Sequence, residues 1–172
     1  LVRDAVLLQQ TGQPDVKIEA TLPQAAVAAE LDATMMSQAL TNLIKNAGEA
    51  IETLKQKGAP EDLLPEIKVS LTTSKHGCEI TIADNGIGLP EDRARLFEPY
   101  VTTRDEGTGL GLPIVKKIIE EHGGTLTLED AAVFAGQSHY GAMAVIRLAT
   151  INTTEPIAAK AGEAEAERAG AI

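Results

Sequence analysis

The chain has 172 residues, of which 44% are hydrophobic and only 2% aromatic, and its formal net charge is −10. This length accommodates one domain with its own core, and the composition requires that core to be aliphatic. The acidic balance argues against a nucleic-acid surface, which needs clustered lysines and arginines, but it permits a nucleotide ligand whose phosphate charge Mg²⁺ offsets. The sequence shows no signal peptide, membrane span or internal repeat. We therefore expect a soluble, cytoplasmic fragment without membrane contact, whose parent chain could be anchored in the inner membrane.

Hydrophobic periodicity and turn residues predict the elements in chain order. Residues 1–15 are expected to be the end of a preceding helix or a linker, closed by a glycine and a proline. A strand is expected over 16–23, and the strongest helical pattern runs from about Asp32 to Lys57. After a turn-rich break, the remaining expected elements are an antiparallel hairpin at 67–73 and 78–84, helices at 90–100 and 113–124, and closing strands at 125–130 and 141–150.

These elements predict a two-layer α/β sandwich, in which about three helices cover one face of a mixed, mostly antiparallel sheet. We expect the domain to span residues 16–150. Residues 151–172 are rich in alanine, glutamate and glycine with little periodicity, which predicts a mobile tail. The single cysteine, Cys78, lies at an apolar position of an expected strand, which predicts a buried, inert thiol in a reducing compartment.

Three glycines at alternate positions, in "RDEGTGLGLPIVKK" (104–117), precede the last expected helix. The dinucleotide fingerprint needs G-x-G-x-x-G after a strand, and the P-loop needs a lysine directly after its second glycine. The spacing here is G-x-G-x-G, so neither signature fits. The run alone is compatible with a plain loop that opens a helix and with a backbone that holds phosphates.

Asn42, Asn46 and Glu49 lie on one narrow face of the long expected helix, nearly opposite its apolar stripe. Most such polar faces are simply solvated. Two amides and a carboxylate in register are also able to hold a hydrated cation, since Mg²⁺ takes few protein oxygens and keeps water and phosphate oxygens as its other ligands.

A second cluster, "IADNGIGLP" (82–90), directly follows a strand. Asp84 has the same parity as the apolar residues before it, so its carboxylate is expected to point to the apolar face, where it needs a donor partner. Gly86 and Gly88 remove side chains where another group approaches the backbone closely. The alternative is an ordinary tight turn with the aspartate as a local turn former.

A third cluster, "LFEPYVTTR" (96–104), places Phe97 and Tyr100 beside the glycine run. Such an aromatic pair is able to act as a hinge that packs against either state of a flexible loop. Ordinary core packing is the alternative, and for Phe97 the two interpretations are compatible.

In this order and spacing, the four clusters resemble the ATP-binding catalytic domain of sensor histidine kinases, within the wider superfamily that includes the gyrase, Hsp90 and MutL ATPases. The segment "LTNLIKNAGEAI" is similar to the family's N box, "DNGIG" to its G1 box, "FEPY" to its F box and "GTGLGL" to its G2 box. The resemblance covers residues 16–149 and implies a Bergerat-type ATP-binding fold. The short lid between "TTR" and "GTGLGL" is similar to that of nitrogen-regulation kinases of the NtrB and NtrY type. Tyr100 where phenylalanine is usual, and Arg104 where lysine is common, are mild departures.

The resemblance implies roles for individual residues. Asp84 would accept a hydrogen bond from the adenine amine, and Gly86 and Gly88 would leave room for the base. Asn46 would give an oxygen to Mg²⁺, and Asn42 would support the site or a phosphate, while the carboxylate of the same helical face keeps an open role. The phosphates would meet residues of the lid and of the glycine run, namely Arg104, Gly107, Thr108, Gly109, Leu110 and Gly111.

The acceptor histidine of such kinases lies on a separate dimerisation helix, in a His-Glu or His-Asp motif that this sequence lacks. His122 falls in the last turn of an expected helix, where an imidazole favours the helix dipole, so we expect it to be structural. The resemblance therefore implies an excised catalytic domain that binds Mg–ATP and does not autophosphorylate alone. Its partners would be the acceptor-histidine dimerisation domain of the parent kinase and the receiver domain of a response regulator.

Other functions of the superfamily stay open as alternatives. Hydrolysing ATPases of the gyrase, Hsp90 and MutL kind place a glutamate four residues before the metal-binding asparagine as general base. Here that position is Asn42, whose amide takes no proton at neutral pH. A serine kinase of the anti-sigma type shares the first two boxes, but the F box and the full "GTGLGL" favour a histidine kinase. A module that has lost nucleotide binding is disfavoured by the four intact boxes.

Overall fold

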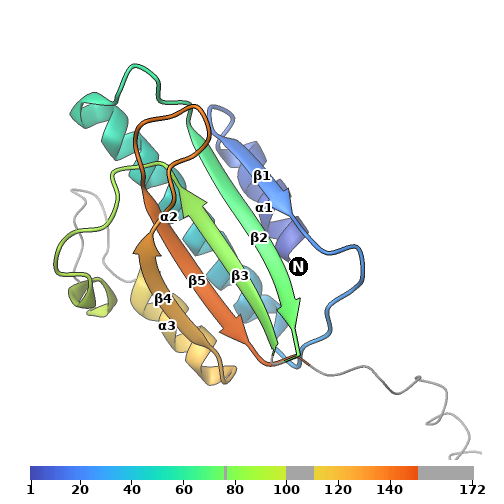
Figure 1. The fold of residues 1–172 in the computed structure, drawn as a ribbon. Coiled ribbons are helices and arrows are strands. Elements are labelled where there is room, and N and C mark those ends of the chain that lie inside the picture. Colours follow the sequence, from blue (N-terminus) through green and yellow to red (C-terminus); the bar gives the residue numbers. More distant parts are fainter. Residues whose placement is uncertain (76, 100–110, 151–172) are drawn as a thin grey trace, which may run out of the picture.

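The structure is a computed structural model that describes residues 1–75, 77–99 and 111–150 (Figure 1). Its helices are α1 (Val2–Gly12), α2 (Ala33–Gly58), the 3₁₀ helix η1 (Ala94–Phe97) and α3 (Gly111–Glu121). Its strands are β1 (Lys17–Thr21), β2 (Glu66–Ser74), β3 (Gly77–Asp84), β4 (Thr125–Asp130) and β5 (Ala142–Leu148). They form one sheet in the order β1-β2-β3-β5-β4, in which β1 runs parallel to β2 and the other neighbours are antiparallel. The expected mixed, mostly antiparallel sheet is confirmed.

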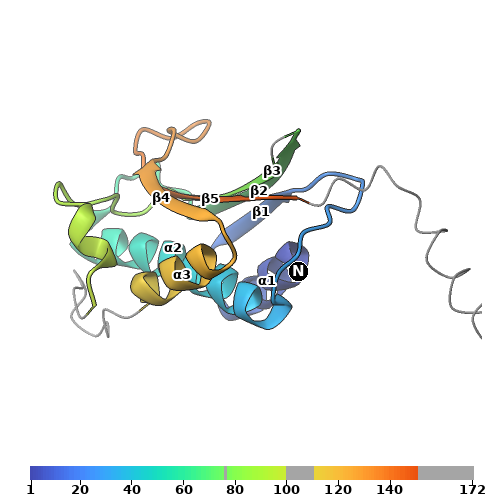
Figure 2. The same cartoon turned by 90° about the horizontal axis from the view of Figure 1, so that it is seen from below.

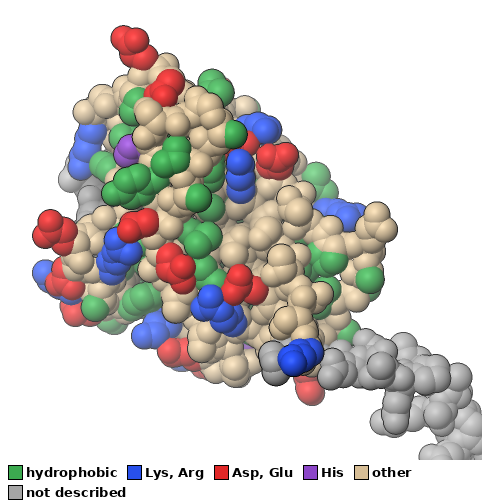
Figure 3. All heavy atoms as spheres, in the orientation of Figure 1, with side chains coloured by type: hydrophobic (Ala, Val, Ile, Leu, Met, Phe, Trp, Pro, Cys, Tyr) green, Lys and Arg blue, Asp and Glu red, His purple; other side chains and the backbone are tan. Residues whose placement is uncertain are grey.

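The three α-helices lie on one side of the sheet, so the domain has two layers (Figure 2). Strand alternation produces this arrangement: in β3, buried residues alternate with half-buried ones from Cys78 to Asp84. The opposite face of the sheet carries interspersed acidic and basic side chains (Figure 3), including an ion pair of 2.9 Å between Arg147 and Glu79. The two-layer α/β sandwich predicted from the sequence is confirmed.

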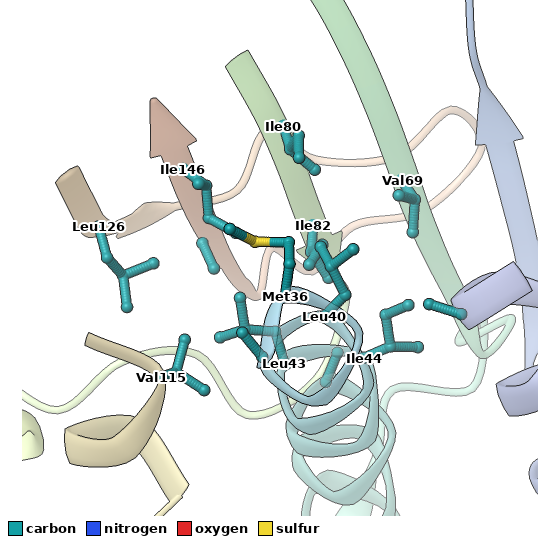
Figure 4. Close-up of a cluster of buried hydrophobic side chains, with 14 of the residues drawn as sticks. Met36, Leu40, Leu43, Ile44, Val69, Ile80, Ile82, Val115, Leu126 and Ile146 are labelled. Carbon is teal, nitrogen blue, oxygen red and sulfur yellow. The ribbon is translucent and has the colours of Figure 1, made fainter. Parts of the chain in front are cut away.

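The core is aliphatic and lies between α2 and the sheet (Figure 4). Asp32 caps the start of α2, because its carboxylate accepts a hydrogen bond of 2.9 Å from the backbone N–H of Met35. The apolar stripe of α2, which includes Met36, Leu40 and Ile44, points at the buried strand and α3 residues Val69, Ile80, Ile82, Val115, Leu126 and Ile146. Burial of each such side chain contributes about 1.5–3 kcal/mol to folding, so this stripe sets the position of α2.

The amino-terminal segment is packed against the domain. Residues Val2–Gly12 form the helix α1, and its Ala5 and Val6 are buried in the core cluster. The sequence predicts that residues 1–15 are the end of a preceding helix or a linker, and that the domain begins at residue 16. This stays a prediction. The structure adds that these residues contribute to the core of the described domain.

The helix expected over residues 90–100 is wrong in extent. Of the described residues 90–99, only Ala94–Phe97 are helical, as a single 3₁₀ turn, and Glu98 is extended with φ −78° and ψ 137°. The carboxyl end of this turn has a local reason: Pro99 follows, and the ring of a proline pushes the residue before it out of the helical region.

The carboxyl end of α3 matches the sequence signals. The described part of the helix runs from Gly111 to Glu121, with Pro113 in its first described turn, and it ends before the His-Gly-Gly stop signal. Gly123 adopts φ +69°, and the N–H of Gly124 donates to the carbonyl of Ile119 at 2.9 Å, which closes the helix end. Within the described residues, every helix is too short or too polar to span a bilayer.

Candidate functional site

A pocket of about 290 Å³ opens between one face of α2, the carboxyl end of β3 and the turn that follows it. Its walls are mostly aliphatic, and Asp84 and Lys57 are the charged side chains in the described part of the lining. The α2 residues that line it recur every three or four positions, as one helical face does: Leu43, Asn46, Ala47, Ala50, Thr53 and Lys57. A largely apolar concavity with a few convergent polar groups is typical of a small-molecule site.

The carboxylate of Asp84 is held at the wall of this pocket. It is the last residue of β3 and has only 4% of its surface exposed. Its Oδ1 accepts hydrogen bonds from the backbone N–H of Gly86 at 2.8 Å and of Ala142 at 3.3 Å. The expected inward direction and the expected donor partners are both confirmed. These donors offset the large free-energy cost of burying a carboxylate.

The two glycines of the turn after β3 have different surroundings. A Cβ on Gly86 would come within 2.5 Å of the Ala50 carbonyl carbon, so the group that approaches this glycine is the backbone of α2. The N–H of Ile87 also donates to the Ala50 carbonyl at 3.1 Å. Gly88 lines the pocket and has φ +80°, a conformation that favours glycine. Gly86 therefore joins the turn to α2, and Gly88 shapes the pocket.

The polar face expected on α2 is divided in the structure. The side chain of Asn46 lines the pocket beside Leu43, whereas Asn42 and Glu49 are outside its described lining. The carboxylate of Glu49 lies 3.7 Å from the Lys45 ammonium. Each step of four residues turns an α-helix by about 40°, so Asn42 is rotated away from the pocket edge that Asn46 occupies.

The end of the glycine run lies beside Asn46. Gly111 belongs to the first described turn of α3, and a Cβ there would be 3.8 Å from the Asn46 side-chain amide nitrogen. The amino-terminal part of α3 therefore lies next to an amide, which suits an anion and its counter-cation. The other expected phosphate contacts and one expected aromatic residue lie outside the described residues: Tyr100, Arg104, Gly107, Thr108, Gly109 and Leu110.

A family model described as "Histidine kinase-, DNA gyrase B-, and HSP90-like ATPase" matches residues 31–152. The chain belongs to this ATPase family. The match runs from the start of α2 through β5 and includes the pocket, so the resemblance given by the four motifs is confirmed. Membership of the family implies that the chain binds ATP.

Two curated relatives show how much of a longer protein the chain represents. It is 47% identical over 134 residues to the nitrogen regulation protein NtrY of Azorhizobium caulinodans, an alignment that covers 76% of this chain and 17% of NtrY. It is 34% identical over 119 residues to the sensor histidine kinase ZraS of Escherichia coli, which covers 69% of this chain and 23% of ZraS. The chain thus spans less than a quarter of the length of either relative.

Solved structures of similar proteins have the same fold. The mycobacterial sensor histidine kinase MprB superposes with a TM-score of 0.67 at 24% identity, over 87% of this chain and 93% of that one. The ATP-binding domain of PrrB from Mycobacterium tuberculosis superposes with a TM-score of 0.64 at 27% identity, over 87% and 91% of the two chains. The fold of this ATPase family member is therefore that of histidine kinase ATP-binding domains.

Two residues that surround Asp84 carry no distinctive signal in the sequence. Asn85 is 1% exposed, and its side chain bonds the N–H of Glu66 at 3.0 Å and the carbonyl of Leu64 at 2.7 Å. A Cβ on Gly141 would collide with the backbone and the carboxylate of Asp84. In the sequence, Asn85 is only a typical turn residue and Gly141 is only the first residue of an expected strand. Neither could be distinguished from ordinary loop residues.

The contacts of His122 and Phe97 test two other expectations, a structural role for the histidine and core packing for the phenylalanine. His122 accepts a hydrogen bond at Nε2 from the N–H of Asp32 (2.9 Å), and its Nδ1–H donates to the carbonyl of Ile118 (2.7 Å). Both ring nitrogens join backbone groups, so its expected structural role is confirmed. Phe97 packs against the core, with the Lys116 ammonium 5.0 Å from its ring centre. The core-packing interpretation therefore holds for Phe97 in this conformation.

Proposed function

We propose that this chain is the ATP-binding catalytic domain of a sensor histidine kinase. It would hold Mg–ATP and transfer the γ-phosphoryl group to a histidine on a separate dimerisation domain. The observation that carries the proposal is the buried Asp84 carboxylate at the wall of an apolar pocket, in a chain of this ATPase family. The likeness to NtrY and ZraS favours the kinase over the hydrolysing ATPases of the same family.

Asp84 would recognise the base. Its carboxylate would accept a hydrogen bond from the exocyclic amine of adenine, while the aliphatic walls contact the faces of the ring. Guanine presents a carbonyl oxygen at the equivalent position, which a carboxylate repels. A hydrogen bond to a charged group contributes about 1.5–3 kcal/mol, so this contact is sufficient to select adenine. Gly88 would keep the rim of the pocket open for the base, and Gly86 would hold the turn against α2.

Asn46 would supply an oxygen to Mg²⁺. The residue fits this role because its amide lines the pocket beside Gly111 of α3, and Mg²⁺ takes few protein oxygens beside phosphates and water. When bound, the ion would neutralise charge on the phosphates. Asn42, one turn earlier on α2 and outside the described pocket lining, would support the site or a phosphate. We assign the phosphate contacts to residues that the sequence motifs identify: Arg104, Gly107, Thr108, Gly109, Leu110 and Gly111.

The transfer itself would need little chemistry from this domain. The bond between the γ-phosphorus and the β–γ bridging oxygen breaks, a phosphorus–nitrogen bond to the acceptor imidazole forms, and ADP leaves. A base on the dimerisation domain would take the imidazole proton. This domain would place the phosphate in line with the imidazole and stabilise the developing charge. Asn42 stands where hydrolysing relatives have a glutamate base, and its amide does not activate water.

The partners follow from this function. The domain would act on the dimerisation domain of its parent kinase, and the phosphoryl group would pass from that histidine to an aspartate in the receiver domain of a response regulator. We place the domain in the cytoplasm, with the parent kinase anchored in the inner membrane, and we propose nitrogen regulation as the signalling class because of the likeness to NtrY.

The experiment combines the chain with a purified fragment that carries the acceptor histidine of the parent kinase, in γ-labelled ATP and Mg²⁺. We expect label on the added fragment, stable to base and labile to acid, and none on this chain alone. Stable phosphohistidine on this chain by itself would refute the proposal that the acceptor histidine lies on a separate domain. Rapid release of inorganic phosphate without the fragment would establish the ATPase alternative, and acid-stable phosphoserine on an added protein would establish the serine kinase.

A further inference from the structure

The β4–β5 loop (residues 131–141) lies on the side of the sheet away from the helices and reaches the carboxyl end of β3 (Figures 1 and 2). Its base is closed by a hydrogen bond of 3.0 Å from the Ala131 N–H to the Gly141 carbonyl. Its Phe134 is 6% exposed, and the Lys68 ammonium lies 4.3 Å from the centre of that ring. The loop is therefore anchored on the outer face of β2.

Two side chains of this loop bond the turn that follows β3. The Nε2–H of His139 donates to the carbonyl of Gly86 at 2.7 Å, and the carbonyl acceptor requires that this nitrogen carry the proton. The Oε1 of Gln137 accepts a hydrogen bond of 2.6 Å from the side-chain amide of Asn85. The β4–β5 loop therefore bonds both an acceptor of this turn, the Gly86 carbonyl, and a donor, the side-chain amide of Asn85.

Gly86 connects His139 to the carboxylate of the pocket. Its carbonyl accepts from His139, and its N–H donates to Asp84 Oδ1 at 2.8 Å. Gly141 of the same loop closes against the other side of Asp84, where a side chain would collide. The orientation of the carboxylate therefore depends on a glycine that the histidine holds in place.

We propose that His139 is a positioning residue for recognition of the base. It fixes Gly86 so that the Asp84 carboxylate points at the exocyclic amine of adenine, and it is itself outside the described lining of the pocket. This inference rests on the proposed function, in which Asp84 accepts that hydrogen bond.

The test compares His139→Gln with His139→Asn. The amide nitrogen of glutamine takes the place of Nε2 and is able to reach the Gly86 carbonyl, whereas that of asparagine takes the place of Nδ1 and falls short. The affinities of ATP and of inosine triphosphate, which carries a carbonyl oxygen in place of the amine, are measured by calorimetry for both variants and the wild type. The matched control is Val133→Ala, an exposed position of the same loop.

We expect wild type, His139→Gln and Val133→Ala to share one ratio of ATP to inosine triphosphate affinity. In His139→Asn, ATP affinity should fall by about tenfold with little change for inosine triphosphate, so the ratio falls with it. A purely structural role would lower the thermal unfolding temperature and leave the ratio unchanged in the folded protein. That result would overturn the proposal.

A second measurement does not depend on the variants folding. Nitrogen-15 chemical shifts of the wild-type imidazole should show a proton on Nε2 of His139 that stays bonded when ATP is added. A neutral ring with its proton on Nδ1 would overturn the inference even if both variants unfold. Wild type that binds neither nucleotide would instead refute the proposed function, so the two failures are distinguishable.

Discussion

At each end of β3, a glycine makes a close contact that leaves no room for a side chain, but the chemical groups buried beside these glycines differ. At the start, a Cβ on Gly77 would collide with the carbonyl oxygen of Leu148 in β5, and at the end a Cβ on Gly141 would collide with Asp84. Next to the first contact lies the buried thiol of Cys78, and burial raises its pKa above the ordinary value. At the other end lies a buried carboxylate, which accepts two backbone N–H groups.

This difference shows which end of β3 is constrained by more than packing. A thiol is a small apolar group that the core accepts without a partner. A buried carboxylate needs donors in fixed positions, and here β5 and the turn after β3 both supply them. The constraints on geometry therefore concentrate at the Asp84 end, while the Cys78 end only has to pack.

The largest expected effect is that of Asp84→Ala on ATP affinity. Loss of the charge-assisted hydrogen bond to adenine should lower the affinity by about 100-fold, measured by isothermal titration calorimetry. The matched control is Glu79→Ala, on the outer face of the same strand, which removes an exposed ion pair with Arg147 and should leave affinity unchanged. Equal affinities for both variants would place base recognition elsewhere.

The next effect is on stability at the same end. Gly86→Ala should lower the free energy of unfolding by about 1–3 kcal/mol, because the new methyl group meets the backbone of α2. Urea denaturation measures it, and ATP affinity should fall with it because the turn must shift. Gly12→Ala in α1 is the control, since a Cβ there meets nothing within 4 Å, and its free energy should change by less than about 0.5 kcal/mol. A neutral Gly86→Ala would contradict the tight packing of the turn.

The smallest effect concerns Cys78. Burial raises the pKa of this thiol in the folded chain, so folding favours the neutral form. The resulting stability is fully present below the unfolded-state pKa and is lost as the pH rises through the higher folded-state pKa. We expect slow alkylation by iodoacetamide at pH 8 and rapid alkylation in denaturant, with ATP affinity unchanged in Cys78→Ala. Equally fast alkylation of the folded chain would show that this end of β3 opens readily.

The elements with strong local patterns were predictable from the sequence. The period of α2, the alternation of β3 and the inward direction of Asp84 each depend on regular backbone geometry, and the structure bears out all three. The expected helix over 90–100 is reduced to Ala94–Phe97 among the described residues, and its carboxyl end is set by Pro99, which restricts Glu98.

The composition of the site was only partly predictable. Asn46 and Gly88 line the pocket as expected, but Asn42 is rotated away from it and Gly86 contacts α2. A polar face on an isolated helix does not reveal which of its edges meets a neighbouring element. That choice depends on how α2 packs on the sheet.

The sequence by itself determined most of the secondary structure, the aliphatic core and the family motifs, because periodicity and motif spacing are properties of residues close together in the chain. Only the tertiary structure decided that His139 and Gln137 meet the turn after β3, some fifty residues earlier in the chain. These contacts are hydrogen bonds between loops, and they form only where the sheet brings the end of β3 and the start of β5 side by side. If Asp84 recognises the base as proposed, that recognition depends on residues whose role no local pattern reveals.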